Sequence, residues 1–373
     1  MSNNPIYFDY AATTPTDSKV LEEMLPYFSQ IYGNASSSTH LQGDTAKKAV
    51  KRAQRQIAEL ISAEPEEIYF TSGSTESINL VIKGIFESST GKNKHFITVK
   101  TEHKAVLDTC GYLEGQGANI TYLDVDSDGL IDLDELENSI TESTVLASVM
   151  YANNETGVLQ DVNTIGEICK KHNVLFFSDA TQAMGKVDIN VANMPIDMLC
   201  FSGHKMYGPK GIGGLYIRKG LRPSGQIHGG GHQSQIRSGT LNVPGIVGLG
   251  KAAELANESH KSEPQRLRQL RDNLEESLLS NNKVKINGSK ESRLPNISNI
   301  QLLGQEAEEF ILRNKMKISV AMGSACNSEV IEPSHVLKAM GLSDIEANSS
   351  IRISLGIGTT ANDLETLVQL IKS

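Results

Sequence analysis

The chain of 373 residues has no tryptophan, only four cysteines and no apolar run near the roughly 18 residues that cross a bilayer. Its N-terminal segment MSNNPIYFDYAATTP lacks a basic stretch followed by an apolar core, so a secretory leader is not expected. Lys and Arg number 35 against 44 Asp and Glu, and this net charge of −9 disfavours nucleic acid as a partner. These absences predict a cytoplasmic protein without a membrane or nucleic-acid role.

The four cysteines, Cys110, Cys169, Cys200 and Cys326, lie far apart and show no CxxC or Cys/His spacing. A disulfide framework and a zinc site are therefore excluded, and no metal is expected. The first three lie in helical or strand patterns, which predicts small core residues. Cys326 lies in GSACNS before the helix start EPSHVL, which predicts an exposed loop, and an exposed free thiol calls for a functional reason.

Short apolar or β-branched runs alternate with longer helical patterns, as in 45–61, where apolar residues recur three and four apart. This alternation predicts an α/β fold whose sheet is mainly parallel, with helices on both faces. About seven strands are expected, at 68–72, 95–99, 119–123, 145–150, 174–179, 197–202 and 214–218.

The pattern changes near residue 260, where a charged helix is followed by the short alternating runs ISNIQL and MKISVA and by further helices. A length of 373 residues also suggests two domains at roughly 150 residues each. We expect a large domain over 16–260 and a smaller α+β domain made of 1–15 with 261–373, which carries Cys326.

Polar side chains follow five of the expected strands. Because ligands of parallel α/β sheets bind beyond the carboxyl ends of the strands, these segments should meet in one crevice. Each has a simpler interpretation as a helix N-cap, although a helix N-terminus also offers free N–H groups to an anion. The segments are TSGSTES (71–77), TEHK (101–104), NNETG (153–157), DATQ (179–182) and SGHK (202–205).

Asp179 and Lys205 end two different expected strands. At such a place the Asp179 carboxylate is partly desolvated and needs a cationic or hydrogen-bonding partner. Lys205 is either an ion-pair partner for Asp179 or a neutral amine available as a Schiff-base nucleophile. A lysine, a carboxylate and an anion cradle together favour pyridoxal 5'-phosphate. This cofactor needs an amine for its aldehyde, a carboxylate for its ring nitrogen and a site for its phosphate.

These segments carry a resemblance that covers nearly the whole chain. From YFDYAATTP at 7–15 through KTEHKAVLDTC, SGHKMYGPKGIGGLYIR, HGGGHQSQIRSGT and GSACNS to SSIRISLG at 349–356, the sequence resembles the cysteine desulfurases. These enzymes form a NifS/IscS-like subgroup of the class V aminotransferases. The resemblance implies a fold-type I transferase that depends on pyridoxal phosphate and acts as a homodimer.

The resemblance also implies roles for individual residues. Lys205 would be the Schiff-base lysine and the base at the substrate Cα, Asp179 would hold the pyridinium, and the His103 ring would lie over the cofactor ring. Gln182 and Asn154 would surround the phenolic oxygen. The phosphate would be held by Ser74, Thr75, Ser202, His204 and, from the partner subunit, Thr240.

Substrate and sulfur chemistry follow from the same resemblance. Arg352 with Asn34 would clamp the α-carboxylate of L-cysteine, because a guanidinium binds a carboxylate bidentately. The thiolate of Cys326 would take the substrate sulfur as a persulfide, release L-alanine and pass the sulfur to an acceptor. An iron–sulfur scaffold protein or another thiol carrier would serve as acceptor, and the sequence leaves its identity open.

Two alternatives stay open from the residues: a selenocysteine lyase or β-eliminating lyase of the same fold, and a non-catalytic sulfur carrier. Departures from the family pattern are Ala35 after Asn34, where proline is usual, and Ala321 with Met322 before GSAC, where two serines are frequent. The chain also ends 21 residues after Arg352, before the extension with which longer members dock a scaffold.

The segment DVDSDGLIDLDE at 124–135 matches the pattern of a calcium-binding loop. The preceding NITYLDV alternates like a strand rather than a helix, and no second loop pairs with it. We therefore interpret 124–135 as a strand end, a turn at Gly129 and a helix that begins near Asp132, with acidic residues in its first turn.

Overall fold

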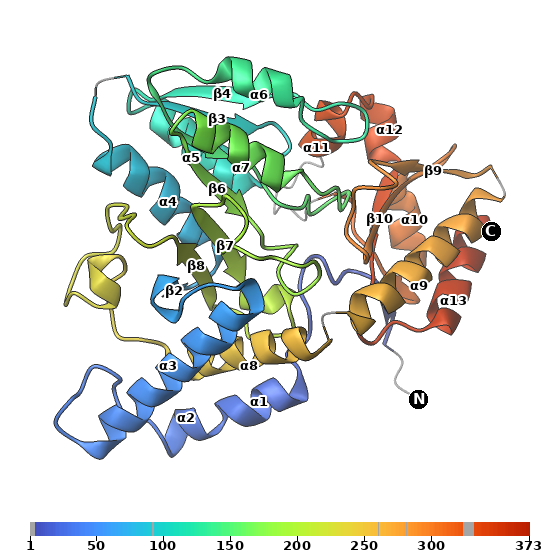
Figure 1. Ribbon diagram of the computed structural model, residues 1–373. Helices are drawn as coiled ribbons and strands as arrows, with labels where there is room; N and C mark the ends of the chain where they lie inside the picture. The colour runs from blue at the N-terminus through green and yellow to red at the C-terminus, as the bar shows by residue number, and fades with distance from the viewer. Residues whose placement is uncertain (1–3, 92, 260, 281, 324–331) are drawn as a thin grey trace.

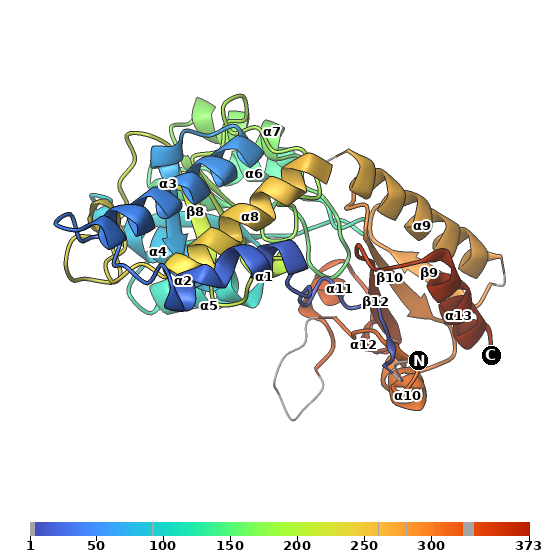
Figure 2. The same ribbon diagram turned by 90° about the horizontal axis from the view of Figure 1, so that it is seen from below.

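The computed structural model describes residues 4–91, 93–259, 261–280, 282–323 and 332–373 (Figure 1). Its larger part is a seven-stranded sheet between helices, and a smaller part built from the C-terminal third lies beside it (Figure 2). Within the described residues, none of the helices combines the length and apolar character that a membrane span requires.

The large sheet runs parallel except for one strand. β8 is antiparallel to both of its neighbours, β2 and β7, whereas the remaining neighbours pair in parallel. All seven strands expected from the sequence are confirmed to within two residues. In spatial order they are β2 (Ile68–Thr71), β8 (Gly213–Ile217), β7 (Met198–Ser202), β6 (Leu175–Asp179), β5 (Thr144–Ser148), β3 (His95–Val99) and β4 (Asn119–Leu123).

Helices cover both faces of this sheet, as expected. One face packs in a single apolar cluster with α4 (Ser74–Ser88) and α5 (Lys104–Glu114). The opposite cluster contains the helices α3 (Leu41–Ile61), α6 (Leu133–Ser139), α7 (Val162–Lys171) and α8 (Val243–Ser259). Two short helices, α1 (Ser18–Met24) and α2 (Pro26–Ser29), pack against α8 on the outside (Figure 1). Cys110, Cys169 and Cys200 are buried, which confirms them as core residues.

The smaller part has its own sheet and core. A three-stranded antiparallel sheet, in the order β12–β10–β9, buries an apolar cluster against α9, α10 and α13. The strands are β9 (Val284–Asn287), β10 (Ile297–Leu302) and β12 (Ser350–Ser354), and the helices are α9 (Ser262–Leu279), α10 (Ala307–Asn314), α11 (His335–Ala339), α12 (Asp344–Asn348) and α13 (Ala361–Lys372).

The sequence suggested that ISNIQL alternates between a buried and an exposed face, and this expectation is wrong. Every residue of β10 is buried. The helices of the smaller part cover one face, while polar side chains of the strand reach the larger part, as in the hydrogen bond from Asn299 Nδ2 to the Glu155 carbonyl. Period-two patterning is lost where both faces of a strand are covered.

The N-terminal segment ties the two parts together. β1 (Ile6–Tyr7) pairs in parallel with β11 (Ile318–Ser319) of the smaller part. A few residues later, Thr14 N donates to the His204 carbonyl in the larger part. Backbone hydrogen bonds such as Leu294 N to Gly157 O, 2.8 Å, also cross the junction. The division into 16–260 and 1–15 with 261–373 stays a prediction.

The interpretation of 124–135 as strand end, turn and helix is confirmed. Gly129 has φ +84° in the turn, and Asp126 Oδ1 accepts from the N–H groups of Asp128 and Leu130. Asp132 is the N-cap of α6, with its side chain accepting from Asp134 N and Glu135 N. The acidic side chains thus organise their own backbone, and the described part of the chain contains no cluster of three or more His, Cys, Asp or Glu placed to bind a metal.

Candidate active site

A crevice of about 590 Å³ lies at the carboxyl ends of the parallel strands, within the usual size of a small-molecule site. Five strand ends contribute to its lining, as the sequence predicted. The crevice brings together ten of the predicted site residues: Ser74, Thr75, His103, Asn154, Asp179, Gln182, Ser202, His204, Lys205 and Arg352.

Lys205 lies in the short 3₁₀ helix η2 (Gly203–Lys205) that directly follows β7. Its Nζ donates to the carbonyls of Ala11 and Ala12, both at 2.6 Å. Burial lowers its pKa to about 8. The positive charge of Arg352 also lowers this pKa, whereas the negative charges of Asp9 and Asp179 raise it. The lowered pKa makes the uncharged amine, which is the form that attacks an aldehyde, much more populated near neutral pH than in an ordinary lysine.

Asp179 is the last residue of β6 and is buried. Its Oδ1 accepts from Thr181 N at 2.9 Å, from the Thr181 hydroxyl, and from Cys200 Sγ at 3.4 Å. These donors offset the cost of burying the carboxylate and fix its orientation toward the crevice.

The start of α4 provides the anion-binding end of the crevice. Ser74 and Thr75 open this 15-residue helix, whose free N–H groups and positive dipole end favour a negative charge. The Ser74 hydroxyl contacts the Thr181 hydroxyl at 2.6 Å, which links this end to the Asp179 carboxylate. Burial lowers the pKa of His204 to about 4, helped by nearby lysines, so its ring is neutral where it contacts the Thr13 hydroxyl.

His103 and Gln182 line the crevice from two different segments, one at the start of α5 and one after β6. His103 is the N-cap of α5, and its Nδ1 accepts from Ala105 N at 3.1 Å. The surrounding protein lowers the pKa of His103 by desolvation, although the residue is exposed. The negative charge of Asp179 raises this pKa, whereas the charges of Lys205 and His335 lower it. The buried Gln182 donates from Nε2 to Ala11 O, and its Oε1 has no hydrogen-bond partner within the described residues.

Arg352 comes from the smaller part, in the middle of β12, and its guanidinium enters the crevice. It donates to the Asn154 carbonyl at 2.9 Å and forms an ion pair of 2.7 Å with Asp9. Its Nε is buried without a hydrogen-bond partner among the residues the structure describes. A buried guanidinium held in this way presents a fixed positive charge to a carboxylate ligand.

Two of the predicted site residues that the structure describes are not brought into the crevice. Asn34 is exposed, and its Oδ1 accepts from Ser36 N within its own turn. Thr240 is exposed in the segment before α8. Neither is among the described residues that line the crevice of this chain. Cys326 lies outside the described residues.

Asp9, Ala11 and Thr181 were not predicted as site residues from the sequence, but they contact residues that were. Asp9 pairs with Arg352 across 343 positions of sequence, and Ala11 O accepts from both Lys205 and Gln182. Asp9 and Ala11 lie in the motif YFDYAATTP and Thr181 lies in DATQ, so membership of these motifs could have indicated them as site residues. No local pattern, however, states which carbonyl or carboxylate meets a residue hundreds of positions away.

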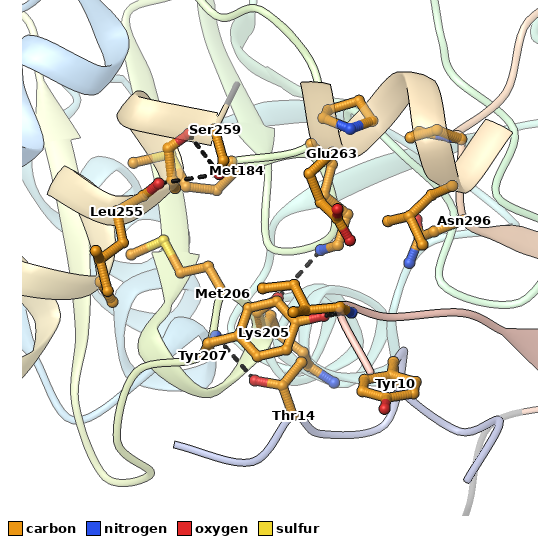
Figure 3. A pocket seen from close by; sticks show the side chains of 18 of the residues that line it. Tyr10, Thr14, Met184, Lys205, Met206, Tyr207, Leu255, Ser259, Glu263 and Asn296 are labelled. Carbon is orange, nitrogen blue, oxygen red and sulfur yellow. Dashed lines mark hydrogen bonds between the residues drawn. The ribbon is translucent and has the colours of Figure 1, made fainter. Parts of the chain in front are cut away.

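A second cavity lies on the other side of Lys205 and is shown in Figure 3. Its volume is about 70 Å³, and Met184, Met206 and Leu255 give it an apolar lining. The buried Lys186 amine donates to the carbonyls of Gln182 and Lys205, which fixes the backbone on which Lys205 is carried. This space is too small for a cofactor, so the larger crevice is the candidate site.

The chain is similar to known proteins over nearly its full length. The model of the family described as "Aminotransferase class-V" matches residues 6–367. A protein named cysteine desulfurase IscS from Methylococcus capsulatus is 49% identical over 370 residues, covering 99% of this chain and 92% of the relative. One of the same name from Klebsiella pneumoniae is 48% identical over 372 residues, with the same coverage of both chains.

Two solved structures are also similar. One titled "NIFS-LIKE PROTEIN" superposes with a TM-score of 0.92 at 37% identity, covering 99% of this chain and 98% of that one. Another, titled "SspA in complex with cysteine", has a TM-score of 0.84 at 40% identity and covers 94% of this chain and 98% of that one.

Proposed function

The chain belongs to the class V aminotransferase family, whose members use pyridoxal 5'-phosphate, and from this premise we propose that it is a cysteine desulfurase. The observation that carries the proposal is the crevice itself, in which a lysine with a lowered pKa, a buried carboxylate, a helix N-terminus and a buried arginine meet. Relatives named cysteine desulfurase match the chain almost end to end, and one similar structure is titled as a complex with cysteine.

The residues of the crevice fit the cofactor. Lys205 Nζ suits its aldehyde and Asp179 its ring nitrogen, and the hydroxyls of Ser74 and Thr75 at the start of α4 and of Ser202 at the end of β7 suit its phosphate. The buried Gln182 Oε1 lacks a partner among the described residues, as expected for an atom that meets a ligand. When bound, the cofactor supplies an electron sink for the substrate Cα.

The side chains of the protein bind and orient the substrate around this group. Arg352 binds the α-carboxylate of L-cysteine, with its position held by Asp9 and Asn154 O. Lys205, once free of the cofactor, removes the Cα proton, a role that suits an amine with a pKa of about 8. His103, at the opening of the crevice, assists proton movement.

Sulfur transfer then requires a second thiol. The thiolate of Cys326 attacks the substrate sulfur, an S–S bond forms, and the electron pair of the broken C–S bond remains on the substrate Cβ, which is protonated. One L-cysteine and one Cys326 thiol thus give one L-alanine and one Cys326 persulfide. Two acceptor thiols, or a reductant of that class, restore Cys326 and release the sulfur as sulfide.

We also propose that two copies of the chain assemble, with Thr240 serving the phosphate site of the partner and Asn34 the substrate carboxylate. Support comes from their exposure away from this chain's own crevice. The sulfur is passed to a thiol-bearing acceptor protein in the cytoplasm, as in iron–sulfur cluster assembly. The relatives named IscS support this assignment.

The test is to incubate the holoenzyme with L-cysteine and a thiol reductant and to follow alanine and sulfide together. The wild type should form both in equal amounts, and Cys326→Ala should lose both by at least a hundredfold while keeping its cofactor. Pyruvate and ammonia in place of alanine, or turnover that survives in Cys326→Ala, would instead identify a β-eliminating lyase.

A further inference from the structure

Glu155 is a buried carboxyl that the chemistry above does not use. It lies in the turn NNETG after β5, and none of its surface is exposed. The turn holds its backbone firmly, because Glu155 N donates to Asn153 Oδ1 at 2.8 Å and Glu155 O accepts from Asn299 Nδ2 at 3.3 Å. A carboxylate at such a place needs partners, and these show what it organises.

The Glu155 side chain meets two residues that lie eleven positions apart in sequence. Its Oε2 accepts a hydrogen bond from the Ser334 hydroxyl. A Cβ added to Gly323 would lie only 2.9 Å from the same Oε2, so the Gly323 backbone approaches this carboxylate closely. Gly323 is the last described residue before the segment 324–331 that contains Cys326, and Ser334 is the third described residue after it, so these two residues lie on its two flanks.

The first flank is also joined to the proposed substrate-binding arginine. Ala321 and Arg352 exchange two backbone hydrogen bonds, 2.7 and 3.3 Å long. The Arg352 guanidinium in turn donates to the carbonyl of Asn154, the residue before Glu155. Arg352, Asn154 and Glu155 therefore form a connected unit with the chain that leads to Gly323.

The second flank is docked over the turn that carries His103. Ser334 is the N-cap of α11 and accepts from Leu337 N at 3.2 Å, while its hydroxyl hydrogen goes to Glu155. The next residue, His335, contacts the Glu102 carbonyl through Nε2 at 2.9 Å. The position of the second flank thus depends on Glu155 and on the same strand end that presents His103.

We propose that Glu155 is a positioning residue for sulfur transfer, because it fixes both flanks of the Cys326 segment beside the arginine that binds the substrate carboxylate. This inference rests on the proposed function. A side chain that reacts must be held within a fraction of an ångström of a productive geometry, and a shift of its supporting chain is felt as a lower rate of the chemical step.

The test compares Ser334→Ala and Glu155→Ala with a matched control, Ser343→Ala. Ser343 likewise caps a five-residue helix, α12, and donates its hydroxyl to a carboxylate, Glu346, at 2.8 Å. The control therefore removes the same kind of cap and hydrogen bond away from the Cys326 segment. Glu155→Gln keeps an acceptor for the Ser334 hydroxyl and serves as the conservative variant.

The measured quantities are the single-turnover rate of persulfide formation on Cys326, detected by mass, and KM for L-cysteine. We expect Ser334→Ala and Glu155→Ala to slow persulfide formation at least tenfold with KM changed less than twofold. Ser343→Ala should match the wild type, and Glu155→Gln should recover most of the rate.

Equal rates in Ser334→Ala and Ser343→Ala, or a loss in Glu155→Ala that lies in KM alone, would overturn the role of Glu155 while leaving the proposed function in place. If Glu155→Ala does not fold, Ser334→Ala decides. A wild type that forms no persulfide on Cys326 would overturn both proposals.

Discussion

At the scale of single residues, two buried carboxyls near the crevice have different numbers of hydrogen-bond donors. Asp179 Oδ1 has three donors. Glu102 is also fully buried; its Oε1 accepts from Met150 N, and its Oε2 has no hydrogen-bond partner within the described residues. Burial therefore raises the pKa of Glu102 well above its usual range, and the charge of Asp179 raises it further.

The raised pKa of Glu102 predicts a pH dependence of stability. A carboxyl whose pKa is raised on folding binds more protons in the folded state, so its contribution to stability is lost as pH rises from the unfolded pKa through the folded one. Glu102→Gln removes that loss. The free energy of unfolding by urea, measured from pH 5 to 8, should therefore increase in Glu102→Gln relative to the wild type as pH rises.

The exposed Glu142 provides the control, because Glu142→Gln should follow the wild type at every pH. Parallel curves for Glu102→Gln and the wild type across the whole pH range would show that Glu102 has an ordinary pKa.

At the scale of elements, the anion-binding end of the crevice depends on how closely two strands approach the start of α4. Gly213 begins β8 and pairs with Thr71 of β2 and Ser202 of β7. A Cβ at Gly213 would lie 2.7 Å from the Gly73 Cα and 2.6 Å from the Phe201 carbonyl oxygen. Only glycine allows the turn before Ser74 to rest on the sheet.

We therefore expect Gly213→Ala to push the start of α4 away from β8. Overpacking at such a site costs about 1–3 kcal/mol of stability, and the affinity for pyridoxal phosphate should fall because the phosphate-binding residues move. The measurements are urea unfolding of the cofactor-free protein and equilibrium dialysis with the cofactor.

The matched control is Gly111→Ala in the middle of α5, where the nearest atom to an added Cβ is 3.9 Å away. It should stabilise the protein by about 0.5–1 kcal/mol and leave cofactor affinity unchanged. Equal behaviour of the two variants would contradict the close approach of β8 to the start of α4.

At the scale of the whole molecule, large apolar side chains are exposed along one stretch of the N-terminal region. Phe28 is 61% exposed, Tyr32 72% and Leu41 74%, and Leu21 and Leu25 are half exposed. They lie along the stretch that runs from α1 through α2 to the first residue of α3, on the outer side of the large part (Figure 1). Asn34 lies in the same stretch, which makes it our candidate for the surface between two subunits.

Phe28→Glu combined with Leu25→Asp should therefore shift the proposed dimer to monomer in analytical ultracentrifugation at micromolar concentration, because two charges are placed in an apolar contact. Activity should fall with the dimer, since Thr240 of the partner subunit would be lost from the phosphate site. Met316→Glu is the control, because Met316 is 76% exposed on the smaller part. A double variant that sediments like the wild type would exclude this surface.

The sequence by itself determined the local elements and the chemical types at their ends. The seven strands of the large sheet, the turn at Gly129 and the three core cysteines follow from periodicity, turn residues and spacing, which act within a few residues. The polar segments after the strands were predictable as one crevice, because parallel strands place their carboxyl ends at the same edge.

Only the tertiary structure decided which distant groups meet. The ion pair of Asp9 with Arg352, the carbonyls of Ala11 and Ala12 at Lys205, and the contact of Ser334 with Glu155 join positions 179 to 343 residues apart. Such contacts, and the depressed pKa of Lys205 that burial produces, depend on how the two parts of the chain pack. Packing and desolvation are properties of the assembled fold, and a local sequence pattern does not encode them.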